Sequence, residues 1–330
     1  MAVLLVCVRV ATSLERRAIA AQAAVPATGA AVARHVDRAR LMRDVTRLAS
    51  GDFAGRRSGT PGGLAARAWV VAQFTAIGLA PAGSSGFLEP FGLTPHSVRA
   101  PITAGRSAAA GLGDAANVVG RIPGRAPSLR AIVVSAHYDH LGVQDGHIYY
   151  GADDNASGVA TLLEAARWFE AHPPRHPMIF VAFDAEELGL QGARTFVASG
   201  LAPPASLALD VNLDMVSRND RREIFAAGTY QSPWLKPILE DVQRRSAVRI
   251  LFGHDRPARL AGGLDDWTDE SDHGAFHDAG VPFVYFGVED HADYHRPTDT
   301  PDKIDSGFFG DAADMIVEAI VTLDARTREP

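Results

Sequence analysis

The stretch Gly151-Ala152-Asp153-Asp154-Asn155-Ala156-Ser157-Gly158 places two adjacent carboxylates and several small residues directly before a run with helical periodicity. Two neighbouring acids raise each other's pKa unless a positive charge lies beside them. The small residues that follow allow a backbone to approach a ligand closely. The stretch therefore predicts either a carboxylate that reaches a cation from a turn before a helix, or an Asx-rich helix cap, because Asp and Asn often cap helices.

Short apolar runs of strand length alternate with helical patterns around this stretch. The runs 131–136, 178–183 and 208–213 are almost continuously apolar, as is expected of strands that are buried on both faces of a sheet. A further strand over 281–286 and a closing helix over 308–323 continue the alternation. The sequence therefore predicts an α/β fold with a mixed, largely parallel central sheet and helices on both faces.

The composition excludes several classes of protein. The 330 residues carry a formal net charge of −7 with scattered acids and bases, and no basic stripe suggests a nucleic-acid partner. No run approaches the roughly 18 apolar residues of a membrane span. The single cysteine, Cys7, excludes an internal disulfide framework and a zinc site built from thiolates. Any bound metal would therefore need His, Asp and Glu ligands.

The first residues of the chain differ in composition from the rest. Residues 2–10 form a short run that is apolar except for Arg9, and residues 18–33 are rich in Ala and Val with Ala-x-Ala-like sites. This pattern resembles the end of a secretory signal peptide, although no basic residues precede the apolar run; an ordinary helical N-terminus is the alternative. We expect a signal peptide or flexible segment over 1–34, a secreted or periplasmic protein, and a single domain over 35–330.

Acidic and histidine side chains follow the ends of the predicted strands. His137, the pair Glu186-Glu187 and Asp214 lie at the carboxyl ends of three of them, and ligand sites in open α/β sheets gather at that edge. Two divalent ions need a bridging carboxylate, together with one histidine and one further carboxylate on each ion. In a pair of adjacent glutamates, one can bind a metal while the other takes a proton from water. The pattern thus favours a metal centre with two ions.

Five motifs occur in order along the chain: HYDHLG at 137–142, GADDNASG at 151–158, FDAEELGLQG at 183–192, NLDM at 212–215 and YH at 294–295. Together they resemble the motifs of the co-catalytic zinc aminopeptidases of the M28 peptidase family. The resemblance implies the zinc-exopeptidase (phosphorylase/hydrolase-like) fold. Family members often carry a protease-associated insert, but only about forty irregular residues stand at that place here, so we expect no separate insert domain.

The resemblance also implies the metal ligands. Asp154 would bridge two zinc ions. His137 and Asp214 would complete the shell of one ion, and Glu187 and His295 would complete the other. The register of the motif favours Asp154 as the bridge, although a slip of one residue would place Asp153 there.

Other residues take supporting roles in this resemblance. Glu186 would be the general base for attack by a metal-bridging hydroxide on the scissile carbonyl. Asp139 resembles a carboxylate that orients the ligand histidine, a common device at metal sites. Tyr294 resembles a tyrosine that donates to the oxyanion in some members. The family also implies a cis peptide between Asp154 and Asn155.

The resemblance predicts a zinc-dependent exopeptidase, in particular an aminopeptidase that acts on peptides with a free N-terminus. Three alternatives share the fold. A glutaminyl cyclase-like acyltransferase would use a single zinc, whereas the full ligand set argues for two. A carboxypeptidase or dipeptidase would need an arginine cluster for the substrate carboxylate, and a non-catalytic binding domain would be expected to have lost ligands.

Overall fold

The structure is a computed structural model that describes residues 34–94, 115–257, 260 and 262–327. Residues 1–33 of the predicted leader lie outside these residues, and the division into a leader and one domain therefore stays a prediction. Among the helices of the described ranges, none is long and apolar enough to cross a membrane.

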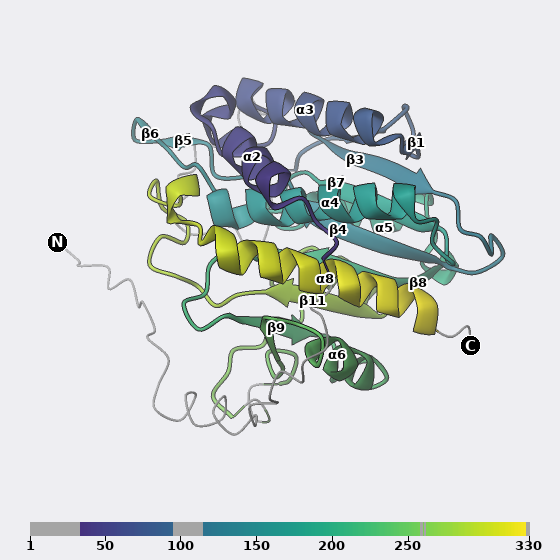
Figure 1. The fold of residues 1–330 in the computed structure, drawn as a ribbon. Coiled ribbons are helices and arrows are strands. Elements are labelled where there is room, and N and C mark those ends of the chain that lie inside the picture. Colours follow the sequence, from purple (N-terminus) through teal and green to yellow (C-terminus); the bar gives the residue numbers. More distant parts are fainter. Residues whose placement is uncertain (1–33, 95–114, 258–259, 261, 328–330) are drawn as a thin grey trace.

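A nine-stranded sheet runs through the described part of the chain (Figure 1). Its strand order is β1 (Ala80–Pro81), β3 (Ala115–Ile122), β7 (Met178–Phe183), β4 (Ala131–His137), β8 (Leu207–Leu213), β11 (Phe283–Gly287), β9 (Glu223–Ala227) and β10 (Arg249–Leu251), with β2 (Leu88–Phe91) paired to β3. The central strands β7, β4, β8 and β11 are parallel to one another, whereas β3 and β9 pair with them in the antiparallel direction. This confirms the predicted mixed, largely parallel sheet.

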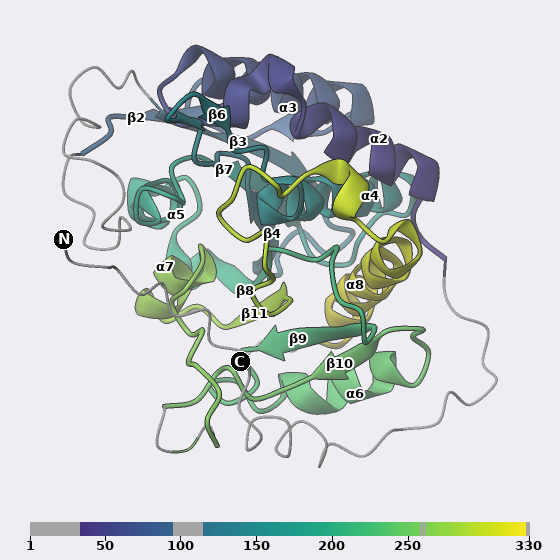
Figure 2. The ribbon, with the colours of Figure 1, turned by 90° about the vertical axis from the view of Figure 1, so that its left-hand side faces the viewer.

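Helices cover both faces of the sheet, as Figure 2 shows. One face carries α2 (Arg38–Leu48), α3 (Pro61–Ile77), α4 (Gly158–Ala171), α6 (Leu235–Gln243) and α8 (Ser306–Arg326), and the other carries α5 (Gln191–Ser199) and α7 (His273–Asp278). Alternate residues of β4 pack against opposite layers, with Ile132 and Val134 on the first side and Val133 on the second. This two-sided burial explains why the strand sequence is continuously apolar.

The acidic turn before α4 forms a separate element. Helix α4 begins at Gly158, directly after η2 (Ala152–Ser157), a turn of π-helical type. The side chain of Asn155 accepts hydrogen bonds from the amides of Gly158 at 2.9 Å and Met215 at 3.2 Å. The side chain of Asn155 therefore binds the first backbone amide of α4. The peptide between Asp154 and Asn155 is cis, as the family resemblance implied.

Candidate metal centre

The candidate site lies at the carboxyl edge of the parallel strands, as the sequence predicted. His137 is the last residue of β4, Asp214 directly follows β8, and the Glu186-Glu187 pair follows β7 after a short turn. Asp154 belongs to η2, and His295 lies in the loop between β11 and α8. Five separate segments therefore supply these side chains.

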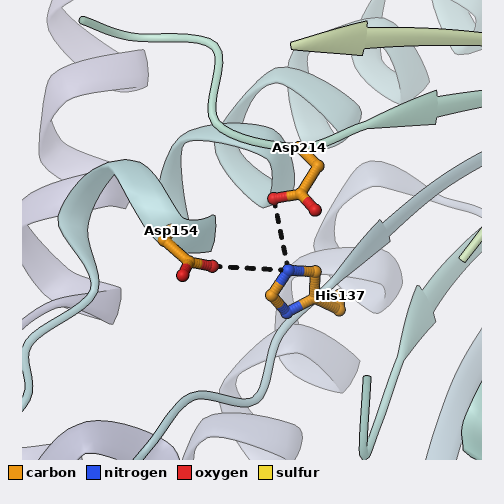
Figure 3. A group of neighbouring side chains, drawn as sticks. All are labelled: His137, Asp154 and Asp214. Carbon is orange, nitrogen blue, oxygen red and sulfur yellow. Dashed lines mark hydrogen bonds and ion pairs between the residues drawn. The ribbon is translucent and has the colours of Figure 1, made fainter. Parts of the chain in front are cut away.

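The first donor group consists of His137, Asp154 and Asp214 (Figure 3). Nε2 of His137 lies 3.5 Å from Oδ1 of Asp154 and 3.3 Å from Oδ1 of Asp214. One ligand atom from each of the three residues lies within 4.8 Å of the others. The side chains are almost completely buried.

The second donor group shares Asp154 with the first. Nε2 of His295 lies 3.1 Å from Oδ2 of Asp154 and 3.3 Å from Oε2 of Glu187. Nδ1 of His140 lies 2.7 Å from the other oxygen of Glu187 and 3.8 Å from Oδ2 of Asp154. The two oxygens of Asp154 therefore face different groups, and this carboxylate stands between them.

The donor set fits zinc. It consists of imidazole nitrogens and carboxylate oxygens, which are ordinary zinc ligands. Although burial alone would lower the pKa of His137, the carboxylates of Asp214 and Glu186 raise it well above its ordinary value. In the same way, Glu187 and Asp154 overcome the effect of burial and raise the pKa of His295 to about 11. The negative field of these carboxylates, which holds protons on the two imidazoles, also attracts a divalent cation.

A cavity of about 270 Å³ opens beside both groups. Glu186 and Tyr294 line it, and the ring of Tyr294 stacks on His295 with the ring centroids 3.9 Å apart. Burial, and then the charge of Asp154, raises the pKa of the Tyr294 hydroxyl well above its ordinary value. The complete lining is His137, Asp154, Glu186, Glu187, Gly189, Leu190, Asp214, Met215, Asp269, Glu270, Tyr294 and His295.

The two adjacent glutamates differ in their electrostatic surroundings. Burial raises the pKa of Glu186 well above its ordinary value, and the carboxylate of Glu187 adds to this effect against the opposing influence of His137. Burial alone would also raise the pKa of Glu187, but the imidazoles of His295 and His140 lower it well below its ordinary value. Glu186 therefore holds a proton more tightly than an ordinary carboxyl group, whereas Glu187 loses its proton more readily.

The carboxylates of Asp139 and Asp153 make their hydrogen bonds outside the two donor groups. Oδ1 of Asp139 lies 3.7 Å from Nδ1 of His137, beyond hydrogen-bond distance, and accepts instead from the amide of Glu186 at 3.1 Å. Nδ1 of His137 lies 3.3 Å from the backbone carbonyl oxygen of Asp139. The side chain of Asp153 accepts from the amide of Ser217 at 2.8 Å and lies 3.1 Å from Nε2 of His291, so it does not join either donor group.

Sequence reasoning missed two residues of the site. The sequence motifs assign no role to His140, but its Nδ1 lies 2.7 Å from Oε1 of Glu187. Its position three residues beyond His137, in the same motif after a strand, was an available signal. Asp299 accepts from the backbone amides of Asp153 and Asp154, and nothing in the sequence alone indicates this contact.

The fold and the donor groups together define a candidate metal site at the edge of an α/β sheet. A model of peptidase family M28 matches residues 117–320, which is more than half of the chain. The chain therefore belongs to peptidase family M28.

Curated relatives are similar over part of their length. Aminopeptidase YwaD of Bacillus subtilis (strain 168) is 28% identical over 211 residues, which cover 60% of this chain and 42% of that protein. A probable zinc metalloprotease of Pyrenophora tritici-repentis is 29% identical over 212 residues, which cover 54% of this chain and 46% of its own. The matches therefore span less than half the length of these two relatives.

Solved structures resemble the chain over most of its length. BSAP, a zinc aminopeptidase from Bacillus subtilis, has a TM-score of 0.67 at 18% identity and covers 89% of this chain and 96% of its own. A glutaminyl cyclase of Bacteroides thetaiotaomicron, bound to N-acetylhistamine, has a TM-score of 0.63 at 16% identity. The match covers 88% of this chain and 99% of the cyclase chain. At these identities the likeness shows the fold alone, and it includes enzymes of two different activities.

Proposed function

We propose that the chain is a zinc-dependent aminopeptidase, an exopeptidase that releases N-terminal residues from peptides with a free N-terminus. The observation that carries the proposal is the pair of donor groups that share Asp154 beside a cavity lined by Glu186. Family M28 membership and the aminopeptidase YwaD among the relatives support it.

Asp154 would bridge two zinc ions, with His137 and Asp214 on one ion and Glu187 and His295 on the other. His295 is the preferred nitrogen ligand of the second ion because it lines the cavity, whereas His140 does not. When bound, the zinc ions supply Lewis-acid polarisation of the scissile carbonyl and a lowered pKa for water.

Glu186 is the proposed general base. It takes a proton from the water whose oxygen attacks the scissile carbonyl carbon, and it passes this proton to the amine when the carbon–nitrogen bond breaks. The raised pKa of Glu186, caused mainly by burial, suits a group that must both accept and return a proton. The neutral hydroxyl of Tyr294 would donate a hydrogen bond to the oxyanion that develops during attack.

Acidic residues at the cavity support recognition of a substrate amine. Asp269 and Glu270 line the cavity beyond the donor groups, and none of its described lining residues is Lys or Arg. A substrate carboxylate would therefore meet negative charge, whereas a protonated α-amine would meet complementary charge. This favours an aminopeptidase over a carboxypeptidase.

We also propose export to the periplasm or the medium. The support is the apolar run and the Ala-x-Ala-like sites within residues 1–34. Expression of the full chain, followed by N-terminal mass analysis of the protein outside the cytoplasm, tests this point. A protein that stays inside with its N-terminus intact would contradict it.

The activity is tested with aminoacyl chromophores and their N-acetylated counterparts, together with elemental analysis of the purified protein. We expect two zinc ions per chain and release from the free-amine substrates only. Chelation should abolish release, and added zinc should restore it. Glu186→Gln should lower kcat by roughly 10²–10⁴-fold without loss of zinc, as expected for the loss of a general base.

One zinc per chain, no chromophore release and cyclisation of a peptide with an N-terminal glutamine would instead assign the protein as a glutaminyl cyclase. Failure to bind metal under zinc-replete conditions would overturn the mechanism.

A further inference from the structure

Arg56 is a fully buried arginine outside the part of the chain that the family model matches. It ends η1 (Gly51–Arg56), the turn between α2 and α3. Its Nη1 donates to the carbonyl of Tyr150 at 2.5 Å, and its Nη2 donates to the carbonyls of Gly151 at 2.7 Å and Asp154 at 3.0 Å. One guanidinium thus binds three carbonyl oxygens of the turn that carries Asp154.

Asp299 binds the same turn through its amides. Its carboxylate accepts from the backbone amides of Asp153 at 3.0 Å and Asp154 at 3.1 Å, and its carbonyl accepts from the amide of Ala152 at 3.2 Å. Asp299 is also fully buried. The turn is therefore held by a buried cation on its carbonyl oxygens and by a buried carboxylate on its amides.

The charge of Arg56 is compensated by the acidic site beside it. Burial lowers the pKa of Arg56, and the carboxylates of Asp154 and Asp299 oppose this shift. The planar guanidinium offers five donors in a fixed geometry, whereas a lysine ammonium is a compact charge on a flexible chain. Lysine would therefore keep the charge but would not hold the three carbonyls in the same arrangement.

Asp154 is the residue that both donor groups share, so a shift of its backbone would move a ligand of each ion at once. We infer that Arg56 is a positioning residue that fixes Asp154 for metal binding, and that the segment before the family match thereby increases the affinity for zinc. The inference rests on the zinc site of the proposed function. It does not depend on which substrate the enzyme cleaves.

The test is zinc binding by the full chain in the absence of substrate, measured by competition with a chromophoric chelator. Arg56→Lys is compared with the wild type and with Arg40→Lys. Arg40 is a matched control because its Nε and Nη2 bind Glu164 at 2.6 and 2.9 Å, which ties α2 to α4 away from the site. Thermal unfolding of the zinc-free proteins is measured in parallel.

We expect Arg56→Lys to weaken zinc binding by roughly 10–100-fold, the usual effect of losing a partner that orients a ligand. Arg40→Lys should bind zinc as the wild type does, even where its unfolding temperature falls. If Arg56→Lys does not fold, Arg56→Gln, which keeps two donors without the charge, takes its place.

An unchanged zinc affinity in a folded Arg56 variant would overturn the inference. Failure of both variants to fold would also overturn it, because Arg56 would then serve the stability of the fold alone. A wild-type chain that binds no zinc would overturn the zinc site itself, and the inference with it. Normal zinc binding without peptidase activity would contradict only the proposed activity.

Discussion

Nδ1 of His140 lies 2.7 Å from Oε1 of Glu187, and the other oxygen of the same carboxylate faces His295 at 3.3 Å. His140 is fully buried and does not line the cavity. A buried imidazole on one oxygen restricts the orientation of the Glu187 side chain and leaves the second oxygen to face the donor group. His140 can therefore determine how Glu187 meets a metal without being a ligand.

Replacement of His140 should weaken zinc binding in a way that depends on the substituent. His140→Leu removes the contact with Glu187 and should lower the zinc affinity by roughly 10–100-fold. His140→Asn places an amide nitrogen near the position of Nδ1 and should retain most of the affinity. Isothermal titration of both variants with zinc checks the prediction. Equal losses in the two variants would show that the contact with Glu187 is not the reason for the effect.

The adjacent glutamates offer a matched pair of substitutions. Glu186→Gln should keep the zinc content of the wild type, because its role is proton transfer. Glu187→Gln should lose zinc, because it replaces the carboxylate that lies against both His140 and His295. Elemental analysis of the two dialysed variants measures the difference. The opposite result, with loss of zinc in Glu186→Gln alone, would exchange the two assignments.

The central strands and the edge that carries the site could be predicted because their sequence signals are local. Continuous apolar runs identify strands buried on both faces, and the polar residues that end β4 and β8 mark their carboxyl ends. Strand β9 was not predicted, since its first residue, Glu223, reads as a surface charge. In the structure Glu223 is buried and pairs with Arg221 and Arg249. Such a strand is identified only through its tertiary partners.

The contacts that position the site residues could not be predicted for a related reason. Asp299 and Asp154 are 145 residues apart in the sequence, and their contact joins a carboxylate to a backbone amide. Hydrogen bonds of this kind leave no periodicity in the sequence and need no particular residue on the amide side. The proposed ligands could be named from the sequence because the five motifs resemble those of the M28 family, whereas the contacts that position them depend on the folded chain.

Asp210 should make the stability of the protein depend on pH. It lies on β8, where the hydroxyl of Ser135 donates to its Oδ1 at 2.9 Å, and burial raises its pKa to about 8. The folded state therefore binds this proton more tightly than the unfolded state, whose carboxyl titrates near pH 4. The free energy of unfolding consequently falls as the pH rises between about 4 and 8, and it loses nothing further from this group above pH 8.

Asp210→Asn removes this titration while keeping an acceptor for Ser135. Relative to the wild type, the variant should become more stable by about 1.4 kcal/mol for each pH unit between about pH 4 and pH 8. Urea unfolding of both proteins at several pH values and equal zinc concentration measures the gain. Asp278→Asn, at an exposed position, is the control. Its free energy of unfolding should change with pH in the same way as that of the wild type. A parallel curve for Asp210→Asn would contradict the prediction.

Gly151 should be required both for its backbone conformation and for the space that its missing side chain leaves. Its φ is +57°, and a Cβ there would lie 2.1 Å from the carbonyl oxygen of Asp154 and 2.6 Å from Nη2 of Arg56. Gly146 has a similar φ of +78°, but a Cβ there would meet no atom within 4 Å. The two glycines therefore separate the cost of a left-handed conformation from the cost of a clash.

Both Gly151→Ala and Gly146→Ala should lose about 1–2 kcal/mol of stability, because a residue with a Cβ is strained in the left-handed backbone conformation. Gly151→Ala should lose more, because either the carbonyl of Asp154 or the guanidinium of Arg56 has to move, and it should also bind zinc more weakly. Gly146→Ala should keep the zinc affinity of the wild type. Urea unfolding and zinc titration of the two variants give both quantities. Equal zinc affinities would mean that the turn can shift without moving the carboxylate of Asp154, and the link between turn geometry and metal binding would then be wrong.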